Sequence, residues 1–368
     1  MSVNAVIFVI IAVFVVIAAF DKAFGNHLKL GSELEKGLDS FGPLALSMVG
    51  MISLAPLLAK ILSPVVVPAF AVLGADPAMF AGTLLANDMG GYPLAIEMAE
   101  SEDAGLLAGT VVAALLGDTI VFTVPVGLGI IAEKNREAFA RGILVGVTVT
   151  PVGVITGGLA AGFDLRMIFS NLLPVIIVAL AIALGLILAP KGLTKGFLLF
   201  GKGLVSVITI TLGIGAFEYL TGYQIMPIGW ELVPITEGLE IVATICVFLM
   251  GAFPFMYFLT KVGKKPLGTI GRALGIGETS ASGFLITLAN PIPTFQMMED
   301  MNSRGVFLNT AWAVSSLAAF GDHLGFTAGV APQMIFPMIV GKMSAAVTAL
   351  IAAVIVARKM YPSQKEAS

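Results

Sequence analysis

The chain contains the segment Met79-Phe-Ala-Gly-Thr-Leu-Leu-Ala-Asn-Asp-Met-Gly-Gly-Tyr-Pro93, which is apolar enough for a membrane helix but holds adjacent glycines and a proline. Residues of these types in mid-segment break a helix. A second segment, Phe284-Leu-Ile-Thr-Leu-Ala-Asn-Pro-Ile-Pro293, carries a Pro-x-Pro break in a similar apolar setting. We therefore predict that residues 79–98 and 279–298 are interrupted helices with a polar turn at each break.

The composition of the whole chain places these segments in a membrane. Of its 368 residues, 58% are hydrophobic and only 12% are charged, whereas soluble proteins carry about 25% charged residues. A soluble enzyme, a nucleic-acid-binding protein and a disordered protein are excluded, and the expected fold is an all-α polytopic membrane protein. The net charge of −3 comes with no basic block, so we expect the lipid bilayer and no nucleic acid as partners. The single Cys246 excludes a disulfide framework and a cysteine-based metal site, and we expect no cofactor.

Apolar runs long enough for a transmembrane helix, about 20 residues, occur outside the two interrupted segments as well. They are Val3–Phe20, Gly42–Ala59, Gly105–Ile131, Gly142–Gly162, Met167–Leu188, Phe197–Leu220, Ile241–Leu259, Gly305–Val330 and Met334–Val356. Together with the interrupted segments they predict about 9–11 membrane segments. The first run has no basic residue before it and no small-residue cleavage site after it, so we interpret it as a retained span and not as a signal peptide.

Short matches between the two halves of the chain recur at a nearly constant separation. The separation is 201 residues between Leu73-Gly74 and Leu274-Gly275, 203 between Leu85-Ala86-Asn87 and Leu288-Ala289-Asn290, and 204 between Gly117-Asp118 and Gly321-Asp322. Such an ordered series is typical of two diverged copies of one unit. We predict a first membrane repeat over residues 1–165, a linker helix over 166–196 and a second repeat over 197–368.

The distribution of Lys and Arg indicates how the interrupted segments lie in the membrane. If both are re-entrant hairpins and the C-terminus is cytoplasmic, the inside loops hold 16 Lys and Arg residues and the outside keeps only Lys60 and Arg166. If both segments cross fully, the counts become 8 inside and 10 outside. Cytoplasmic loops carry the Lys/Arg excess, so we predict inverted repeats with one re-entrant hairpin entering from each side. The alternative is a helical bundle with two kinked helices.

Ionisable residues inside membrane segments are costly, so each one is a candidate functional residue. Three carboxylates against one lysine leave the interior net negative when all are ionised, which favours a small cationic substrate or a coupling cation such as Na⁺ or H⁺. The candidate residues are Asp118 in the middle of its span, Asp322 and His323 at the matching place in the second half, Asn87, Asp88, Gly90 and Asn290 at the two turns, and Lys342 in the last span.

Several of these residues also have a purely structural interpretation. Asp118 could be capped by Thr119 and serve only packing, and Lys342 could be the charge partner of one carboxylate. His323 could relay protons or could be hydrogen-bonded to the backbone at the membrane interface.

At these motifs the chain resembles the EutH family, the ethanolamine transporters of bacterial ethanolamine-utilisation operons. The resemblance extends over nearly the whole chain, and its last two segments are specific. It is carried by Met48-Val-Gly-Met51, Met79 to Gly91, Thr119-Ile-Val-Phe122, Leu288-Ala-Asn290, Gly321-Asp-His-Leu-Gly-Phe326 and Ile335-Phe-Pro-Met-Ile-Val-Gly-Lys342. Asp118 is a candidate because of the internal repeat and not because of the family.

The resemblance implies uptake of ethanolamine across the bacterial inner membrane by a protein that is not an enzyme. Asp88 or Asp322 is then expected to bind the ammonium group and Asn290 to recognise the hydroxyl. The alternatives are a Na⁺- or H⁺-coupled transporter of another small organic cation and, more remotely, an intramembrane aspartyl protease. We expect a homo-oligomer, and the sequence leaves the energy coupling open.

Overall fold

The computed structural model describes residues 2–361, except for the side chains of residues 264–268, 270 and 272. Lys264, Lys265, Arg272 and Lys365, which belong to the predicted cytoplasmic charge, lie outside the described side chains. Within the described part every regular element is a helix, and eight helical stretches are long and apolar enough to cross a membrane. The prediction of an all-α polytopic membrane protein is therefore confirmed.

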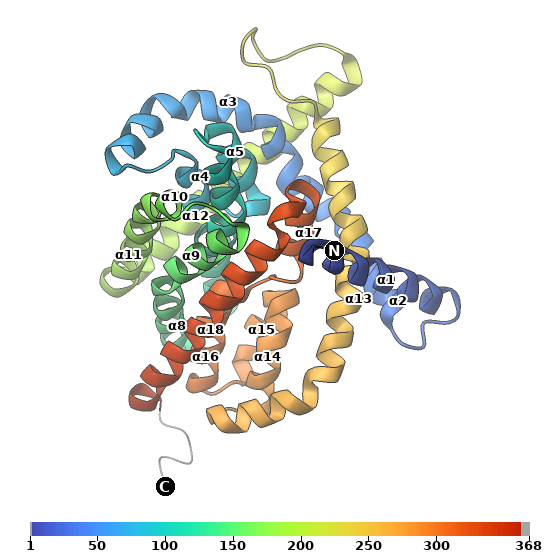
Figure 1. The fold of residues 1–368 in the computed structure, drawn as a ribbon, viewed down its shortest axis with the longest axis vertical. Helices are drawn as coiled ribbons and strands as arrows, with labels where there is room; N and C mark the ends of the chain where they lie inside the picture. The colour runs from blue at the N-terminus through green and yellow to red at the C-terminus, as the bar shows by residue number, and fades with distance from the viewer. Residues whose placement is uncertain (1, 362–368) are drawn as a thin grey trace.

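The elements follow one another in two series along the chain, which meet between Leu188 and Pro190 (Figure 1). The first series is α1 (Val3–Ala23), α2 (Leu30–Asp39), α3 (Phe41–Leu73), α4 (Ala78–Leu84), η1 (Asn87–Met89), α5 (Gly91–Met98), α6 (Glu102–Leu106), η2 (Leu107–Gly117), η3 (Thr119–Thr123), α7 (Val124–Ile130), η4 (Glu133–Asn135), α8 (Arg136–Thr148), α9 (Thr150–Ala161), α10 (Leu165–Ser170) and α11 (Leu172–Leu188). The second is α12 (Pro190–Thr221), α13 (Ile235–Leu274), α14 (Glu278–Ala289), α15 (Pro291–Met297), η5 (Met298–Asp300), α16 (Ser303–Ser316), α17 (Asp322–Val330), η6 (Pro332–Met334) and α18 (Ile335–Met360).

The first interrupted segment is a hairpin. Its helices α4 and α5 contain 7 and 8 residues, about 10–12 Å each, and neither can cross a hydrocarbon core of about 30 Å. The carboxylate of Asp76, just before α4, accepts hydrogen bonds from the backbone N–H groups of Glu100 and Ser101, both at 3.1 Å, just after α5. The segment therefore begins and ends at the same place, with η1 at its tip.

The second interrupted segment has the same construction. Its helices α14 and α15 meet at Asn290. Arg304, which follows the segment, donates from Nε to the carbonyl of Leu274, which precedes it, at 2.8 Å. Figure 1 shows the α4–α5 pair in the upper half of the view and the α14–α15 pair in the lower half.

Glycines hold each hairpin close to the helix that follows it. A Cβ atom added at Gly117 would overlap the carbonyl oxygen of Leu85, and one added at Gly321 would overlap that of Ala289. Both members of this second pair lie 204 residues after those of the first. The two halves of the chain therefore use the same backbone approach, which only a residue without a side chain permits.

Each half of the chain also packs its first helix on the other half. The helix α1 crosses α13, where Gly251 lies against the backbone of Ile11, and α12 crosses α3, where Gly50 lies against the backbone of Ile208. Gly50 and Gly251 are 201 residues apart. The halves are thus intertwined and are not two separate bodies.

The predicted span Gly305–Val330 is wrong as a continuous helix. The helix α16 ends at Ser316 and α17 begins at Asp322, and between them the backbone is irregular, with Ala318 at φ 49°. The matching region of the first half stays helical but is widened into the π-helical elements η2 and η3. Asp118 lies between these two elements, and its backbone N–H donates to the carbonyl of Ala113, five residues back. Both departures from α-helix lie where the candidate aspartates are.

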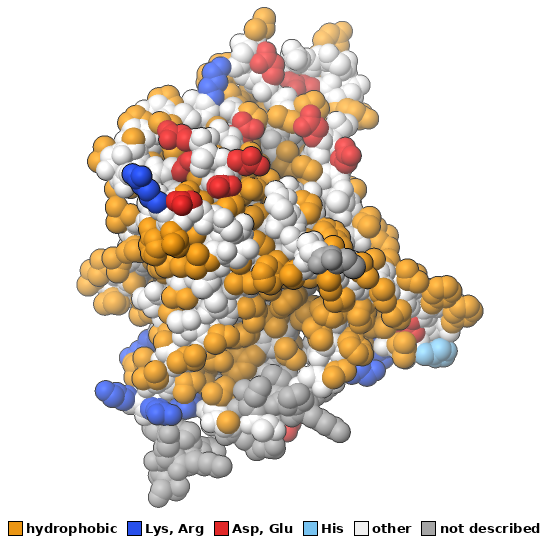
Figure 2. Space-filling model, viewed as in Figure 1, with side chains coloured by type: hydrophobic (Ala, Val, Ile, Leu, Met, Phe, Trp, Pro, Cys, Tyr) orange, Lys and Arg blue, Asp and Glu red, His pale blue; other side chains and the backbone are white. Residues whose placement is uncertain are grey.

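The surface is divided by charge in the way expected of a membrane protein. On the face in Figure 2, most Asp and Glu side chains lie at the top, most Lys and Arg side chains lie at the bottom, and hydrophobic side chains cover the region between. Exposed Leu, Ile, Val and Phe side chains are numerous on α1, α11 and α12. An apolar surface of this extent fits contact with lipid.

Candidate functional site

The two hairpin tips converge on the start of α17. The tip element η1 packs against α17. The second tip is joined to the irregular segment before α17 by backbone hydrogen bonds, from Phe320 N–H to Leu288 at 2.9 Å and from Ala318 N–H to Thr287 at 3.0 Å. Asp322, the first residue of α17, therefore lies between the two tips.

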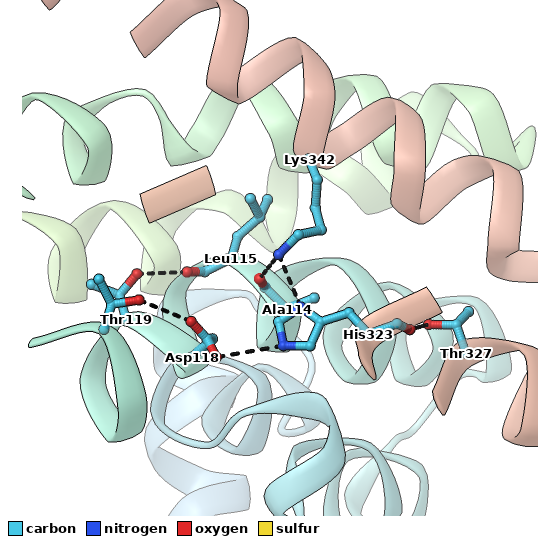
Figure 3. A network of polar contacts seen from close by, with 8 residues as sticks. Ala114, Leu115, Asp118, Thr119, His323, Thr327 and Lys342 are labelled. Carbon is cyan, nitrogen blue, oxygen red and sulfur yellow. Dashed lines mark hydrogen bonds and ion pairs between the residues drawn. The ribbon is translucent and has the colours of Figure 1, made fainter. Parts of the chain in front are cut away.

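A buried chain of polar contacts joins Lys342, His323 and Asp118 (Figure 3). The Lys342 ammonium lies 2.9 Å from Nδ1 of His323 and 2.5 Å from the carbonyl oxygen of Ala114. On the other side of the ring, Nε2 of His323 lies 3.4 Å from Oδ1 of Asp118. All three side chains are almost completely buried, at 0% exposure for Lys342, 2% for His323 and 3% for Asp118.

When Lys342 is protonated, its contact with the ring sets the tautomer of His323. A lysine ammonium only donates hydrogen bonds, so Nδ1 of His323 accepts and the ring proton of a neutral imidazole lies on Nε2, facing Asp118. The second oxygen of Asp118 accepts a hydrogen bond from Thr123 Oγ1 at 3.0 Å. With Lys342 protonated and Asp118 ionised, the network is electrically balanced and every polar group in it has a partner.

Lys342 therefore does not reach a carboxylate directly. Within the described residues its polar contacts are His323 and Ala114, and His323 connects it to Asp118. The sequence allowed Lys342 to be a charge partner, but it could not show that a histidine lies between the two charges.

Asp88 and Asp322 differ from Asp118 in having no such partner. Both side chains are only half-buried, and neither carboxylate forms a hydrogen bond or ion pair to another residue in the described part of the chain. Asp88 lies within electrostatic range of His323, Asp118 and Lys342, and Asp322 lies within range of Asp88. These two carboxylates are thus close to the balanced network without being neutralised by it.

Asn87, next to Asp88 at the first tip, is the second unusual group. Its side chain has 0% exposure, and neither its amide oxygen nor its amide nitrogen has a hydrogen-bond partner among the described residues. Leaving a buried polar group unpaired costs about 1–3 kcal/mol, and such groups in folded proteins commonly face an ion, a water molecule or a ligand.

Two other predicted site residues, Asn290 and Gly90, stabilise the local backbone at the two tips. Asn290 is exposed at the second tip, where its side-chain oxygen accepts from Ile292 N–H at 2.9 Å and caps α15. Gly90 adopts φ 100° and leaves no room for a Cβ atom beside Met51, so it shapes the turn.

Sequence reasoning missed Thr123 and the carbonyl of Ala114. Thr123 is five residues after Asp118, a spacing that does not place two side chains together on an α-helix. The π-helical conformation of this region makes the contact possible, and π-bulges are frequent at functional sites. The residue types in this part of the sequence do not predict a π-helical conformation.

A bundle of apolar helices with ionisable groups buried where broken helices meet defines a polytopic membrane protein with a polar interior. A family model described as "Ethanolamine utilisation protein, EutH" matches residues 3–356. The chain belongs to this family.

Named relatives support the same assignment. The chain is 52% identical over 365 residues to a protein of Listeria monocytogenes named probable ethanolamine permease EutH, covering 99% of this chain and 97% of that protein. It is 40% identical over 386 residues to the Escherichia coli protein of the same name, covering 95% and 94%. A Bacillus subtilis protein with the name YxeR is 44% identical over 353 residues, covering 96% and 95%. No solved structure is significantly similar.

Proposed function

We propose that this chain takes up ethanolamine across the bacterial cytoplasmic membrane and that Asp88 and Asp322 form its ammonium site. The observation that carries the proposal is the pair of carboxylates without a partner beside a network that is already balanced. A cationic substrate would supply the missing charge. The relatives named as probable ethanolamine permeases favour ethanolamine as that substrate.

The Asp118–His323–Lys342 network has a different role in this proposal. Its three members satisfy one another, so none of them is free to exchange its partner for a substrate without leaving a buried charge unpaired. We assign it to holding η2 and α17 at a fixed distance behind the two tips. Lys342 repels the ammonium little because Asp118 offsets its charge.

The hydroxyl of ethanolamine needs a neutral group that donates and accepts hydrogen bonds. Asn290 was expected in this role, but its oxygen is already occupied by Ile292. Asn87 is buried with both ends of its amide free, and an amide offers both a donor and an acceptor. Asn87 is therefore a second candidate, beside Asn290, for the residue that hydrogen-bonds the hydroxyl, and it fits that role better.

The ammonium assignment is tested by measuring ethanolamine binding to the purified protein in detergent by calorimetry. Loss of one hydrogen bond to a charged group costs about 1.5–3 kcal/mol, so Asp88→Asn and Asp322→Asn are each expected to weaken binding about 10- to 150-fold. The control is Asp39→Asn, an exposed carboxylate at the end of α2. If both variants bind ethanolamine as tightly as the parent, the ammonium site lies elsewhere and Asp118 is the next candidate.

The hydroxyl assignment is tested with ethylamine, which lacks the hydroxyl. The parent is expected to prefer ethanolamine, and Asn87→Ala is expected to lose most of that preference while still binding ethylamine. Asn290→Ala serves as the comparison. If Asn290→Ala alone removes the preference, the second tip reads the hydroxyl; an unchanged preference in both variants contradicts the assignment.

The presence of two carboxylates for one ammonium group favours coupling to a second cation. With Asp88 and Asp322 both ionised, a single ethanolammonium leaves one negative charge in the site. A co-transported H⁺ or Na⁺ would balance this remaining negative charge. The same coupling would serve the alternative function, transport of another small organic cation. Uptake into liposomes with imposed Na⁺, pH and voltage gradients separates coupled transport from facilitated diffusion.

The protease alternative is not favoured. Aspartyl proteases use two carboxylates that share one proton, whereas Asp118 is engaged by His323 and Thr123. The relatives are also named as permeases. A lack of cleavage of helical membrane peptides by the purified protein is the expected result.

A further inference from the structure

A cavity of about 940 Å³ lies between the ends of several membrane helices, and none of the candidate-site residues lines it. Its walls come from the end of α7 and the start of α8 on one side and from the junction of α11 and α12 on the other. Three candidate membrane spans, Glu133–Ala161, Leu165–Leu188 and Pro190–Thr221, begin or end here. The cavity is therefore at the boundary between membrane and water.

The polar part of this cavity is basic. It is lined by Arg136, Arg141, Lys191 and Lys195, against two acidic residues, Glu133 and Glu137. Glu137 is already bound to Arg141 at 2.5 Å, and Arg141 also donates to Tyr361 Oη at 3.3 Å.

The remaining charges do not cancel. Arg136, Lys191 and Lys195 form no ion pair with any residue in the described part of the chain. Three cations thus face the cavity with Glu133 as the one unpaired opposing charge. A site of this sign repels an ammonium substrate and attracts an anion.

The rest of the wall is apolar. Leu144 of α8, Leu186 of α11 and Leu198 of α12 line the same cavity. A soluble anion such as inorganic phosphate gains nothing from such a wall, whereas a molecule with an anionic head and a hydrocarbon tail satisfies both parts. Basic pockets between transmembrane helices are known to hold the head groups of anionic lipids.

We propose that this cavity binds one anionic phospholipid of the surrounding membrane, with its phosphate against Arg136, Lys191 and Lys195 and an acyl chain along the leucines. The bound lipid would link α8 to the α11–α12 junction. Because that junction joins the first half of the chain to the second, the lipid stabilises the way in which the two halves are connected. This proposal does not depend on which substrate the protein carries.

The test uses the full-length protein in phosphatidylcholine nanodiscs, to which phosphatidylglycerol is added. Retained lipid is counted by native mass spectrometry, and thermal unfolding is followed in parallel. Each basic residue near an anionic lipid surface contributes about 1 kcal/mol, so Lys191→Gln/Lys195→Gln is expected to weaken phosphatidylglycerol retention about 30-fold. The lipid-dependent rise in melting temperature should disappear with it.

Two further variants make the result specific. Arg358→Gln/Lys359→Gln removes the same charge from exposed positions at the end of α18, and it should retain the lipid as the parent does. Ala140→Phe fills the cavity from α8 without changing charge and should reduce retention as well.

Inorganic phosphate is the probe for a simple anion site. It is expected to leave the melting temperature unchanged. Equal phosphatidylglycerol retention by the parent and by Lys191→Gln/Lys195→Gln would overturn the proposal. So would stabilisation by phosphate equal to that by phosphatidylglycerol, because the apolar wall would then have no role.

Discussion

At the scale of single residues, the arrangement of Lys342, His323 and Asp118 separates charges that are already satisfied from charges that are not. Lys342 donates to His323, and His323 faces Asp118. Asp88 and Asp322 remain outside this balance. In the proposed site the two kinds of group have different roles: the balanced network holds the unpaired carboxylates in place, and a cationic substrate supplies the missing charge.

Removing Lys342 alone should therefore damage folding more than selectivity. In Lys342→Met, Asp118 keeps a buried charge and His323 loses its donor, and leaving one buried charge of a network uncompensated in this way costs about 3–5 kcal/mol. Thermal unfolding in detergent should show a much lower melting temperature. The double variant Asp118→Asn/Lys342→Met removes both charges and should recover part of the loss. A well-expressed Lys342→Met protein with normal melting and normal transport contradicts this assignment.

The sequence was informative about which residues are candidates and uninformative about how they pair. Asp118, Asp322, His323 and Lys342 stand out because ionisable groups are rare inside apolar spans. Their partners depend on the depth and rotation of helices that are far apart in the chain, such as α18 and η2. The unpaired amide of Asn87 could not be recognised before its surroundings were known.

At the scale of elements, the sequence predicts a break in a helix where helix-breaking residues occur, and it does not predict one elsewhere. The breaks near Asn87 and Asn290 were foreseen because Gly-Gly and Pro-x-Pro interrupt a helix, and the structure has helix ends at both places. The irregular segment Leu317–Gly321 was missed because it is Leu-Ala-Ala-Phe-Gly, an apolar run with no proline. That segment is held open by its hydrogen bonds to the second hairpin, which is a tertiary effect.

The close backbone approach of Gly117 to the first hairpin gives a test at this scale. In Gly117→Ala the new Cβ would meet the carbonyl oxygen of Leu85, which belongs to the backbone and cannot move aside cheaply. Overpacking of this kind costs about 1–3 kcal/mol, and it displaces the tip that carries Asp88. We expect a lower melting temperature and weaker ethanolamine binding.

Gly213→Ala is the matched control for this change. Gly213 lies inside α12 with nothing near its Cβ position, so alanine there should leave binding unchanged and should stabilise the helix slightly. Equal effects of the two substitutions would show that the contact between Gly117 and Leu85 is unimportant.

At the scale of the whole molecule, we propose that residues 1–165 and 197–368 are inverted repeats joined by the linker 166–196. The paired glycine contacts at separations of 201 and 204 residues support this, as do the two hairpins, which lie in opposite halves of the view in Figure 1. The exchange of α1 and α12 between the halves means that neither half is expected to fold alone.

Inverted repeats require a definite topology, which cysteine labelling can measure. In a Cys246→Ala background, Ser101→Cys and Tyr223→Cys should react with a membrane-impermeant maleimide from outside whole cells. Lys134→Cys should react only after the cells are opened. All three positions are exposed; Lys134 is preferred to Asn135, which is buried and bonded to Met298. The side chain of Pro266, another predicted inside position, lies outside the described residues.

Labelling of Lys134→Cys from outside would contradict the inverted topology and favour two fully crossing, kinked segments. Labelling of Ser101→Cys only from inside would have the same meaning, because the hydrogen bonds of Asp76 place both ends of the first hairpin together. A cytoplasmic C-terminus follows from the predicted result.

Uptake of radiolabelled ethanolamine into liposomes that contain only this purified protein tests the central proposal most directly. The parent should accumulate or equilibrate ethanolamine faster than protein-free liposomes, and unlabelled ethanolamine should compete better than ethylamine. Asp322→Asn, reconstituted in equal amount and folded as judged by its melting curve, should lose most of this uptake at low ethanolamine concentration. No uptake by the folded parent would contradict the transport function, and parental uptake by both Asp322→Asn and Asp88→Asn would contradict the site.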